Sequence, residues 1–253
     1  MPLEIVTISC LSDNYAFLAH DAITGATAVV DVPEAAPIEA ALKARGWSLT
    51  DILITHHHDD HIQGVDALRA ATGARVVGAA ADAHRLPDLD VALAEGESVS
   101  VGSVAGEVLD VSGHTVGHIA FVFPGVAFTA DSLMALGCGR LFEGDAPTMW
   151  ASLSKLAALP SETLICSGHE YTSANGAFAV TVDPDNAALK ARVADVAQAR
   201  AAGQPTVPST LAEELATNPF LRATAPEVKA FLGMDGAPDS DVFAEIRRRK
   251  DNF

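Results

Sequence analysis

Apolar and polar positions alternate along the first part of the chain, which is the pattern of half-buried β-strands. The alternation predicts strands over Glu4–Leu11, Tyr15–Ala19 and Ala26–Val32, with a turn at Asp21–Gly25 that joins the last two as a hairpin. A helical pattern follows over Glu34–Arg45, and Gly46 stands where a glycine commonly ends a helix. The chain is therefore expected to begin with a β-rich segment followed by a helix.

Short apolar runs separated by polar segments continue to about residue 170 and predict a mixture of strands and helices. Further strands are expected over Asp51–Thr55, Arg75–Gly78, Ser98–Val101, Glu107–Val111, Ile119–Phe123, Val126–Thr129 and Thr163–Cys166. Helices are expected over Ile62–Ala71 and Pro147–Leu159. Such a mixture is typical of an α/β domain.

Beyond residue 170 the strand patterns disappear, and alanine-rich segments with helical periodicity replace them. Helices are expected over Asn186–Ala201, Leu211–Thr217, Pro226–Phe231 and Asp241–Lys250. We therefore predict two domains, an α/β domain over residues 1–170 and a helical domain over residues 171–253.

The net charge of the protein restricts the kinds of molecule that it is expected to bind. The 253 residues include 16 basic and 33 acidic residues, which gives a formal net charge of −17. A surface of this sign repels polyanions, so neither a nucleic acid nor an anionic membrane is expected as a partner. The N-terminal segment predicts a strand rather than a signal peptide. Three cysteines without metal-ligand spacing suit a reducing compartment, so we predict a cytoplasmic protein.

The strongest chemical signal is the segment His56–His61, which follows a predicted buried strand and contains four histidines and two aspartates. At the end of a strand, His56 and His58 share one side, and a following helix brings Asp60 and His61 to a neighbouring point. Polar groups packed so densely beside a core need partners, and imidazole with carboxylate suits a metal ion such as zinc or iron. A solvated loop is the alternative interpretation.

Three more potential ligands follow predicted strands, where α/β proteins commonly build their sites. They are His114, Asp131 and His169. Two other histidines have simpler interpretations. We expect His118 to be a structural hydrogen-bonding residue and His20 to lie at the surface.

In order and approximate separation, these residues resemble the ligand motif of the metallo-β-lactamase superfamily. The resemblance implies an αββα sandwich, in which two sheets pack face to face with helices outside and metals lie at one edge. It assigns His56, His58 and His114 to one metal, Asp60, His61 and His169 to the other, and Asp131 to a bridging position. Among these, Asp131, His58 and Asp60 are expected to be catalytic. Asp31 is expected to orient a ligand histidine, although it could be an ordinary carboxylate at a strand end.

Motifs along nearly the whole chain are similar to those of the glyoxalase II family of hydroxyacylglutathione hydrolases. They are Asp13-Asn14-Tyr15, Gly137–Gly144, Gly168–Thr172, Asn218–Arg222 and Arg247–Asp251. The resemblance implies hydrolysis of S-(2-hydroxyacyl)glutathione thioesters, typified by S-lactoylglutathione, to a hydroxy acid and glutathione. This reaction is the second step of methylglyoxal detoxification.

The same resemblance indicates residues that bind the substrate. Arg247 and Lys250 are expected to reach the glycine-end carboxylate of glutathione, and Arg140 and Tyr171 its peptide portion. Phe142 stands where some relatives carry a tyrosine, so it can pack against the ligand but offers no hydroxyl. The run of cations that contains Arg247 and Lys250 can also complement the dipole of a helix C-terminus.

The implied cofactors are two divalent metal ions, with zinc as the first choice and iron or manganese as alternatives. A hydroxide that bridges the metals is expected to attack the thioester carbonyl. The thiolate, whose conjugate acid has a pKa of about 8.5, can then leave without a general acid. We expect a monomer that acts on a small-molecule thioester. The alternatives are a glutathione persulfide dioxygenase or another thioester hydrolase of the same fold, and a metal-binding scaffold without activity.

Overall fold

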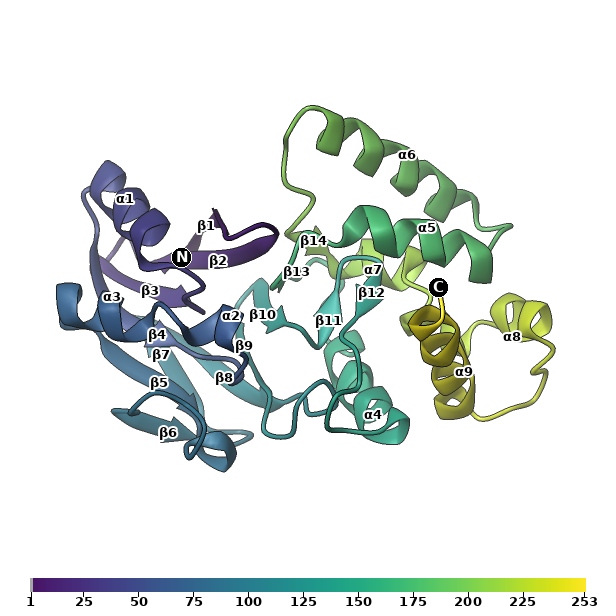
Figure 1. Cartoon of the computed structure of the whole chain (residues 1–253), viewed down its shortest axis with the longest axis horizontal. Helices are drawn as coiled ribbons and strands as arrows, with labels where there is room; N and C mark the ends of the chain where they lie inside the picture. The colour runs from purple at the N-terminus through teal and green to yellow at the C-terminus, as the bar shows by residue number, and fades with distance from the viewer. Residues whose placement is uncertain (1) are drawn as a thin grey trace. The chain divides into compact units, whose positions relative to one another are not determined.

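The computed structural model describes residues 2–253 of the chain (Figure 1). These residues form two compact units. Unit 1 contains the residues up to Val111 together with Val116–Ala130. Unit 2 contains Ser112–Thr115 together with Asp131–Phe253. The chain therefore passes into unit 2 twice, once for a four-residue segment and once for its entire C-terminal half.

A six-stranded sheet with the order β1-β2-β3-β4-β5-β6 lies in unit 1. Its strands are β1 (Glu4–Cys10), β2 (Asn14–His20), β3 (Ala26–Val30), β4 (Ser48–Leu53), β5 (Arg75–Ala79) and β6 (Val91–Leu93). The first three strands pair antiparallel, whereas β3 to β6 are parallel. Parallel strands bring their carboxyl ends to one edge of a sheet. Asp31 after β3 and Thr55 after β4 are therefore neighbours.

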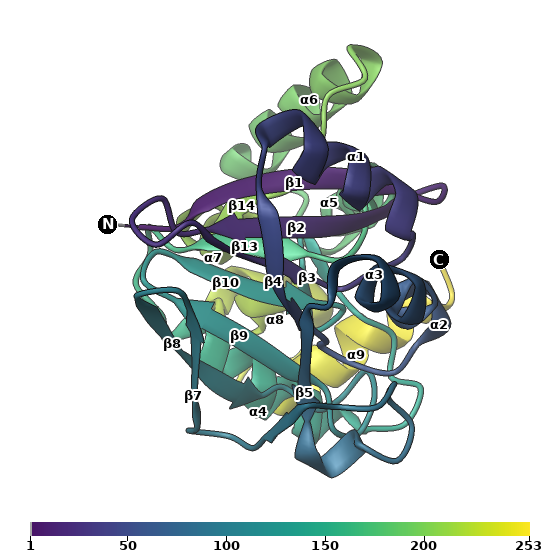
Figure 2. The same cartoon turned by 90° about the vertical axis from the view of Figure 1, so that its left-hand side faces the viewer.

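Helices α1 (Ala35–Arg45) and α3 (Val65–Thr72) contact strands of this sheet and each other, so they cover one of its faces (Figure 2). As the sequence predicts, α1 ends at Gly46, which has the left-handed φ of 67°. The short η1 (Ala80–Asp82) follows β5.

The helix expected over Ile62–Ala71 corresponds to α3, which begins three residues later than expected, and a separate short helix, α2 (Asp59–Ile62), precedes it, with Gly64 between the two. The break coincides with contacts to the end of β3. The N–H of Val32 donates to the carbonyl of His61 at 2.7 Å, and the N–H of Gly64 donates to the carbonyl of Val32 at 3.0 Å. These backbone contacts fix the position of His61.

Four antiparallel strands form a second layer in unit 1. They are β7 (Ser98–Val101), β8 (Val104–Asp110), β9 (Ile119–Phe123) and β10 (Val126–Ala130). The ring of Phe128 in β10 lies 5.9 Å from that of Phe17 in β2 and 6.2 Å from that of Phe123 in β9. These aromatic contacts between strands of the two layers place an apolar core between two sheets packed face to face.

Unit 2 contains most of the helices of the chain. They are α4 (Ala146–Ala157), α5 (Thr172–Val182), α6 (Ala187–Ala201), α7 (Leu211–Thr217), α8 (Pro226–Leu232) and α9 (Asp239–Asp251), with the short η2 (Leu221–Thr224). Its strands are β11 (Leu133–Met134), β12 (Gly137–Cys138), β13 (Leu164–Ser167) and β14 (Ser209–Thr210). The sequence patterns did not predict α5 or the short strands β6, β11, β12 and β14, and these strands are too brief to show alternation. No helix within residues 2–253 is long and apolar enough to cross a membrane.

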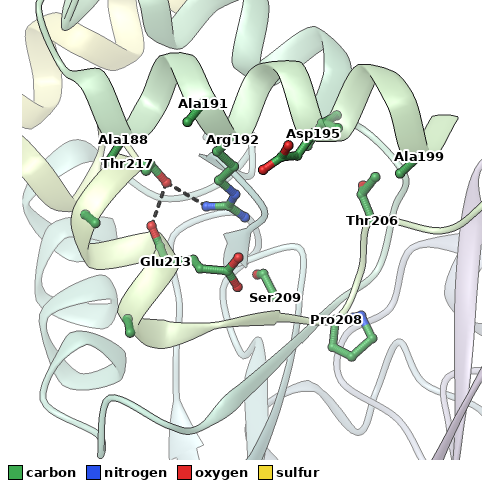
Figure 3. Close-up of a pocket in the computed structure, with 13 residues that line it drawn as sticks. Ala188, Ala191, Arg192, Asp195, Ala199, Thr206, Pro208, Ser209, Glu213 and Thr217 are labelled. Atoms are coloured by element: carbon green, nitrogen blue, oxygen red, sulfur yellow. Dashed lines mark hydrogen bonds between the residues drawn. The ribbon is translucent and has the colours of Figure 1, made fainter. Parts of the chain in front are cut away.

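A fully buried carboxylate, Glu214 of α7, links several segments of unit 2. It accepts hydrogen bonds from the N–H of Leu136 at 2.9 Å and from Nδ2 of Asn218 at 3.0 Å, and it pairs with Arg192 of α6. Arg192 also donates to Thr217 at 2.7 Å, in a pocket of about 580 Å³ between α6 and α7 (Figure 3). The charge of Arg192 therefore holds these two helices together.

Candidate metal centre

The histidine-rich segment runs as an extended stretch from the end of β4 into α2. The rings of His56 and His58 lie 4.9 Å apart with their planes at 74°, as expected for side chains two residues apart in extended backbone. His57 has a different partner, because its Nδ1 lies 2.8 Å from Oδ2 of the buried Asp82. No motif in the sequence indicates this contact of Asp82, which lies in η1.

His61 is oriented by Asp31. Nδ1 of His61 lies 2.8 Å from Oδ2 of Asp31, and both residues are buried. A carboxylate accepts hydrogen bonds, so the imidazole carries its proton on Nδ1 and has its lone pair on Nε2. That Nε2 faces Oδ2 of Asp60 at 3.8 Å. Asp31 therefore restrains the orientation of the His61 ring through this contact.

The carboxylate of Asp60 is in turn held by Asn14, which the sequence indicates only as part of a motif. Nδ2 of Asn14 donates to Oδ2 of Asp60 at 2.9 Å and to its carbonyl oxygen at 3.0 Å. Asn14 is buried at the start of β2. One amide therefore fixes both the backbone and the side chain of Asp60.

Within unit 2, two histidines face one aspartate. Nε2 of His114 lies 3.5 Å from Oδ2 of Asp131, and Nε2 of His169 lies 3.3 Å from the same oxygen. Nδ1 of His114 lies 2.7 Å from the carbonyl oxygen of Arg140. A carbonyl oxygen only accepts, so Nδ1 carries the proton and Nε2 presents a lone pair to Asp131.

The contact between His114 and Asp131 brings two electron-pair donors together, and a cation between them would make that contact favourable. An imidazole lone pair and a carboxylate oxygen repel each other unless a proton or a cation lies between them. Two ligands of a tetrahedral zinc ion, each about 2.1 Å from the metal, are about 3.4 Å apart. The two separations at Asp131, 3.5 Å and 3.3 Å, agree with this value. The His and Asp groupings are therefore compatible with a metal site.

The backbone beside His114 and Asp131 requires a glycine at position 139. A Cβ atom added to Gly139 would lie 2.0 Å from the carbonyl oxygen of Asp131 and 2.8 Å from Nδ1 of His114. The N–H of Gly139 donates to the carbonyl of Ser132 at 3.2 Å. The segment after β12 can therefore approach His114 only because residue 139 has no side chain.

Side chains from the C-terminal helices hold the β11–β12 hairpin, which precedes Gly139. Nδ2 of the fully buried Asn218 donates to the carbonyls of Met134 at 3.0 Å and Gly137 at 2.9 Å. Nη1 of Arg247 donates to the carbonyl of Cys138 at 3.1 Å. The hairpin is thus fixed from its carbonyl side before the chain reaches Arg140.

The four consecutive cations of α9 differ in their surroundings. Arg248 and Arg249 each donate to Glu245 at 2.8 Å, and these hydrogen bonds lower the pKa of Glu245 to about 2. Arg247 is only 5% exposed, pairs with Asp251 at 2.8 Å and lies over the ring of Phe220. Arg247 is therefore a buried support of the hairpin described above.

Lys250 and the remaining predicted substrate residues are more accessible. Burial, followed by the nearby Arg247, lowers the pKa of Lys250 below its ordinary value. The side chain of Arg140 is 60% exposed and Phe142 is 62% exposed. Tyr171 is 40% exposed, and its ring stacks on His169 at 4.6 Å. This stacking places Tyr171 directly beside a candidate metal ligand.

Two of the remaining histidines in unit 1 are buried. His20, which we expected at the surface, is only 8% exposed, stacks on Trp47 at 4.0 Å, and places Nδ1 2.8 Å from Oγ1 of Thr27. His118 is fully buried and stacks on His56 at 4.5 Å. A hydrophobic stacking partner explains the burial of His20, and no local pattern in the sequence reveals it.

Comparison with known proteins identifies the family. The family model described as the metallo-beta-lactamase superfamily matches residues 22–169, and the model described as the hydroxyacylglutathione hydrolase C-terminus matches residues 170–253. A hydroxyacylglutathione hydrolase of Cereibacter sphaeroides is 68% identical over 100% of both chains. The chain belongs to the hydroxyacylglutathione hydrolase family. A relative with this name from Jannaschia sp. is 67% identical over 99% of this chain and 98% of its own. Another, from Methylococcus capsulatus, is 57% identical over 99% of both chains.

Solved structures agree with the fold class predicted from the motifs. ETHE1 from Myxococcus xanthus has a TM-score of 0.70 and 25% identity, over 98% of this chain and 90% of that chain. The B3 metallo-β-lactamase BLEG-1 has a TM-score of 0.65 and 22% identity, over 86% of this chain and 99% of that chain. The second likeness shows the fold alone. The metallo-β-lactamase fold and the hydroxyacylglutathione hydrolase C-terminus are thereby confirmed.

The segment that matches the hydroxyacylglutathione hydrolase C-terminus begins directly after His169. It supplies Tyr171, which stacks on that histidine, and Asn218 and Arg247, which hold the hairpin leading to Arg140. The family's C-terminal segment therefore supports two of the candidate metal ligands.

Proposed function

We propose that this chain hydrolyses S-(2-hydroxyacyl)glutathione thioesters, such as S-lactoylglutathione, to a hydroxy acid and glutathione. The observation that carries the proposal is the 68% identity, over the whole length of both chains, to a protein named hydroxyacylglutathione hydrolase. The match includes residues 170–253, which a separate family model with the same name also covers. The reaction would be the second step of methylglyoxal detoxification.

We assign the metal ligands from the family's motif together with the contacts between imidazole nitrogens and carboxylate oxygens within each unit. One divalent ion would be held by His56, His58 and His114, the other by Asp60, His61 and His169, and Asp131 would bridge them. Zinc is our first choice, and iron and manganese also accept these donors. When bound, such ions lower the pKa of a water molecule to about 7 and polarise the carbonyl of the substrate.

The chain's own residues prepare these ligands. Asp31 keeps the proton of His61 on Nδ1, and the carbonyl of Arg140 does the same for His114, so both rings present Nε2 to a metal. Asn14 holds the carboxylate of Asp60. The glutathione thiolate has a conjugate acid with a pKa of about 8.5, so it can leave without a protonating residue.

Four accessible side chains are proposed to bind the glutathione portion. Lys250 would pair with its glycine-end carboxylate, Arg140 and Tyr171 would contact its peptide groups, and Phe142 would pack against it. Arg247 would add positive charge to the same carboxylate site. Its hydrogen bond to Cys138 and its ion pair with Asp251 indicate that it also supports the hairpin. Local cations of this kind would attract a substrate with two carboxylates to a protein with a net charge of −17.

We expect Lys250→Ala to raise the KM for S-lactoylglutathione about tenfold, because a charged hydrogen bond contributes roughly 1.5 kcal/mol. The kcat should change little, since this contact is the same in the substrate complex and in the transition state. Lys190→Ala, an exposed lysine of α6, is the matched control and should match the wild type. Steady-state kinetics that show a fall in kcat at unchanged KM would contradict this role of Lys250.

The proposed reaction is tested against its rivals with two substrates. Purified metal-loaded protein should release thiol from S-lactoylglutathione and consume no oxygen when given glutathione persulfide. Oxygen uptake without thiol release would instead identify a persulfide dioxygenase. A protein that binds metal but turns over neither substrate would be a scaffold.

We further propose that the chain acts in the cytoplasm as a monomer, with a catalytic domain over residues 1–170 and a substrate-binding domain over residues 171–253. All three cysteines are buried thiols, which suits a reducing compartment. Burial raises the pKa of Cys10 and Cys138 to about 11, so these thiols stay protonated at neutral pH. Light scattering that gives twice the mass of one chain, 26.2 kDa, would contradict the monomer.

A further inference from the structure

Four buried side chains form one hydrogen-bonded network where β3 and β4 end in unit 1. Oδ2 of Asp31 lies 2.8 Å from both Oγ1 of Thr55 and Nδ1 of His61. Oγ1 of Thr55 lies 3.0 Å from Nδ1 of His56. Thr55, His56 and His61 are fully buried, and Asp31 is 3% exposed, so water does not compete for these hydrogen bonds.

The positions of the protons follow from counting donors. An ionised carboxylate only accepts hydrogen bonds, and a threonine hydroxyl has a single proton to give. The hydroxyl of Thr55 donates that proton to Asp31, so towards His56 it can only accept. Nδ1 of His56 is therefore the donor, and its Nε2 carries the lone pair.

We propose that Thr55 is a positioning residue that transmits the charge of Asp31 to His56 and so selects the tautomer that binds a metal through Nε2. Asp31 sets His61 by direct contact and His56 through Thr55. One carboxylate thus prepares one ligand for each of the two metals. That His56 binds a metal through Nε2 rests on the proposed function. The position of its proton depends only on the hydrogen bonds of the network.

The surrounding backbone and rings hold the network in place. Asp31 has a φ of 57°, a left-handed conformation that is unfavourable for a residue other than glycine and persists only where the surrounding structure holds it. The N–H of Thr55 donates to Oδ1 of Asp31 at 2.9 Å, and the N–H of Asp31 donates to the carbonyl of Leu53 at 3.0 Å. The ring of His118 stacks on His56 at 4.5 Å with the planes at 12°. The carboxylate and the imidazole are therefore both restrained in orientation.

The direct test is the tautomer of His56 in metal-free protein, read from the nitrogen-15 shifts of its side chain at about pH 8.5, where an ordinary histidine is neutral. The wild type should show a protonated Nδ1 and an unprotonated Nε2. Thr55→Val, which replaces the hydroxyl with a methyl group of similar size, should shift the population towards the form protonated on Nε2. Thr55→Ser, which keeps the hydroxyl, should restore the wild-type tautomer.

Thr27→Val is the matched control. Thr27 is also fully buried, and its Oγ1 lies 2.8 Å from Nδ1 of His20, so the variant removes the same kind of hydrogen bond from a histidine outside the proposed site. Zinc affinity is measured by competition with a coloured chelator. Thr55→Val should weaken the binding of one zinc ion about ten- to a hundredfold, while Thr55→Ser and Thr27→Val stay close to the wild type.

Two results would overturn this proposed role of Thr55. A wild-type His56 that is protonated on Nε2 would overturn it, even if Thr55→Val did not fold. An unchanged tautomer and unchanged zinc affinity in Thr55→Val would also overturn it. A wild type that shows the expected tautomer but binds no zinc would leave the network intact and contradict the proposed function instead.

Discussion

Replacing Asp131 with alanine should lower kcat/KM for S-lactoylglutathione by at least about a thousandfold, because a metal site contributes several kcal/mol to catalysis. Oδ2 of Asp131 lies within 3.5 Å of Nε2 of both His114 and His169. Without this carboxylate, the site loses the negative charge that is proposed to bridge the two metals. The metal content of the purified variant, measured by elemental analysis, should fall together with its rate.

Asp235→Ala provides the control for this substitution. Asp235 is an exposed aspartate of unit 2, in the segment between α8 and α9, so its loss removes the same charge from the chain without touching the site. It should keep the rate and the metal content of the wild type. An Asp131→Ala protein that also keeps both would contradict the assignment of Asp131.

Replacing Gly139 with alanine should lower the free energy of unfolding by about 3 kcal/mol and reduce kcat/KM about a hundredfold. The new Cβ would lie 2.0 Å from the carbonyl oxygen of Asp131, so the backbone that carries this ligand has to move. A displacement of about 1 Å in a catalytic group is sufficient for such a loss. Urea unfolding and steady-state kinetics measure the two effects.

Gly233→Ala is the control for Gly139. Gly233 ends α8 with a φ of 70°, but nothing lies within 4 Å of an added Cβ. Its replacement should cost about 1 kcal/mol through the backbone and leave kcat/KM unchanged. If Gly139→Ala behaved like Gly233→Ala, the close approach of Gly139 to Asp131 and His114 would not matter for the site.

Much of the fold could be predicted from local patterns. The alternation in the first strands and the glycine after α1 correspond directly to β1, β2, β3 and Gly46. The break between α2 and α3 could not be predicted, because it depends on hydrogen bonds to Val32, which is 29 positions before His61 in the chain. A Cβ at Gly64 would lie 2.8 Å from Cγ1 of Val32, so this glycine marks a close approach that periodicity does not reveal.

In the candidate site too, residues that lie close together in the sequence could be predicted more readily than contacts between distant residues. The types and spacing of residues indicate His56, His58, Asp60 and His61 as ligands, because these side chains lie close together in the sequence. Not every partner that sets a proton position carries a sequence pattern. The partner of His114 is the backbone carbonyl of Arg140, which any residue could provide. Sequence patterns therefore indicate candidate metal ligands more readily than the groups that orient them.

A run of basic residues in the sequence does not show which side chains are paired or buried, and the end of α9 is an example. The sequence contains four equivalent-looking basic residues at 247–250. In the structure, Arg248 and Arg249 pair with Glu245, whereas Arg247 is buried against Phe220 and Cys138. Only the helical position of each residue, and what packs against that face, separates the arginines that pair with Glu245 from the buried Arg247.

The central claim, that this chain is a metal-dependent thioester hydrolase, is tested most directly by reloading metal-free protein with zinc. Chelation should abolish hydrolysis of S-lactoylglutathione while the far-ultraviolet circular dichroism remains that of the folded protein. Stepwise addition of zinc should then restore the rate, which should reach its maximum at two zinc ions per chain. Full activity in protein shown by elemental analysis to contain no metal would contradict the account.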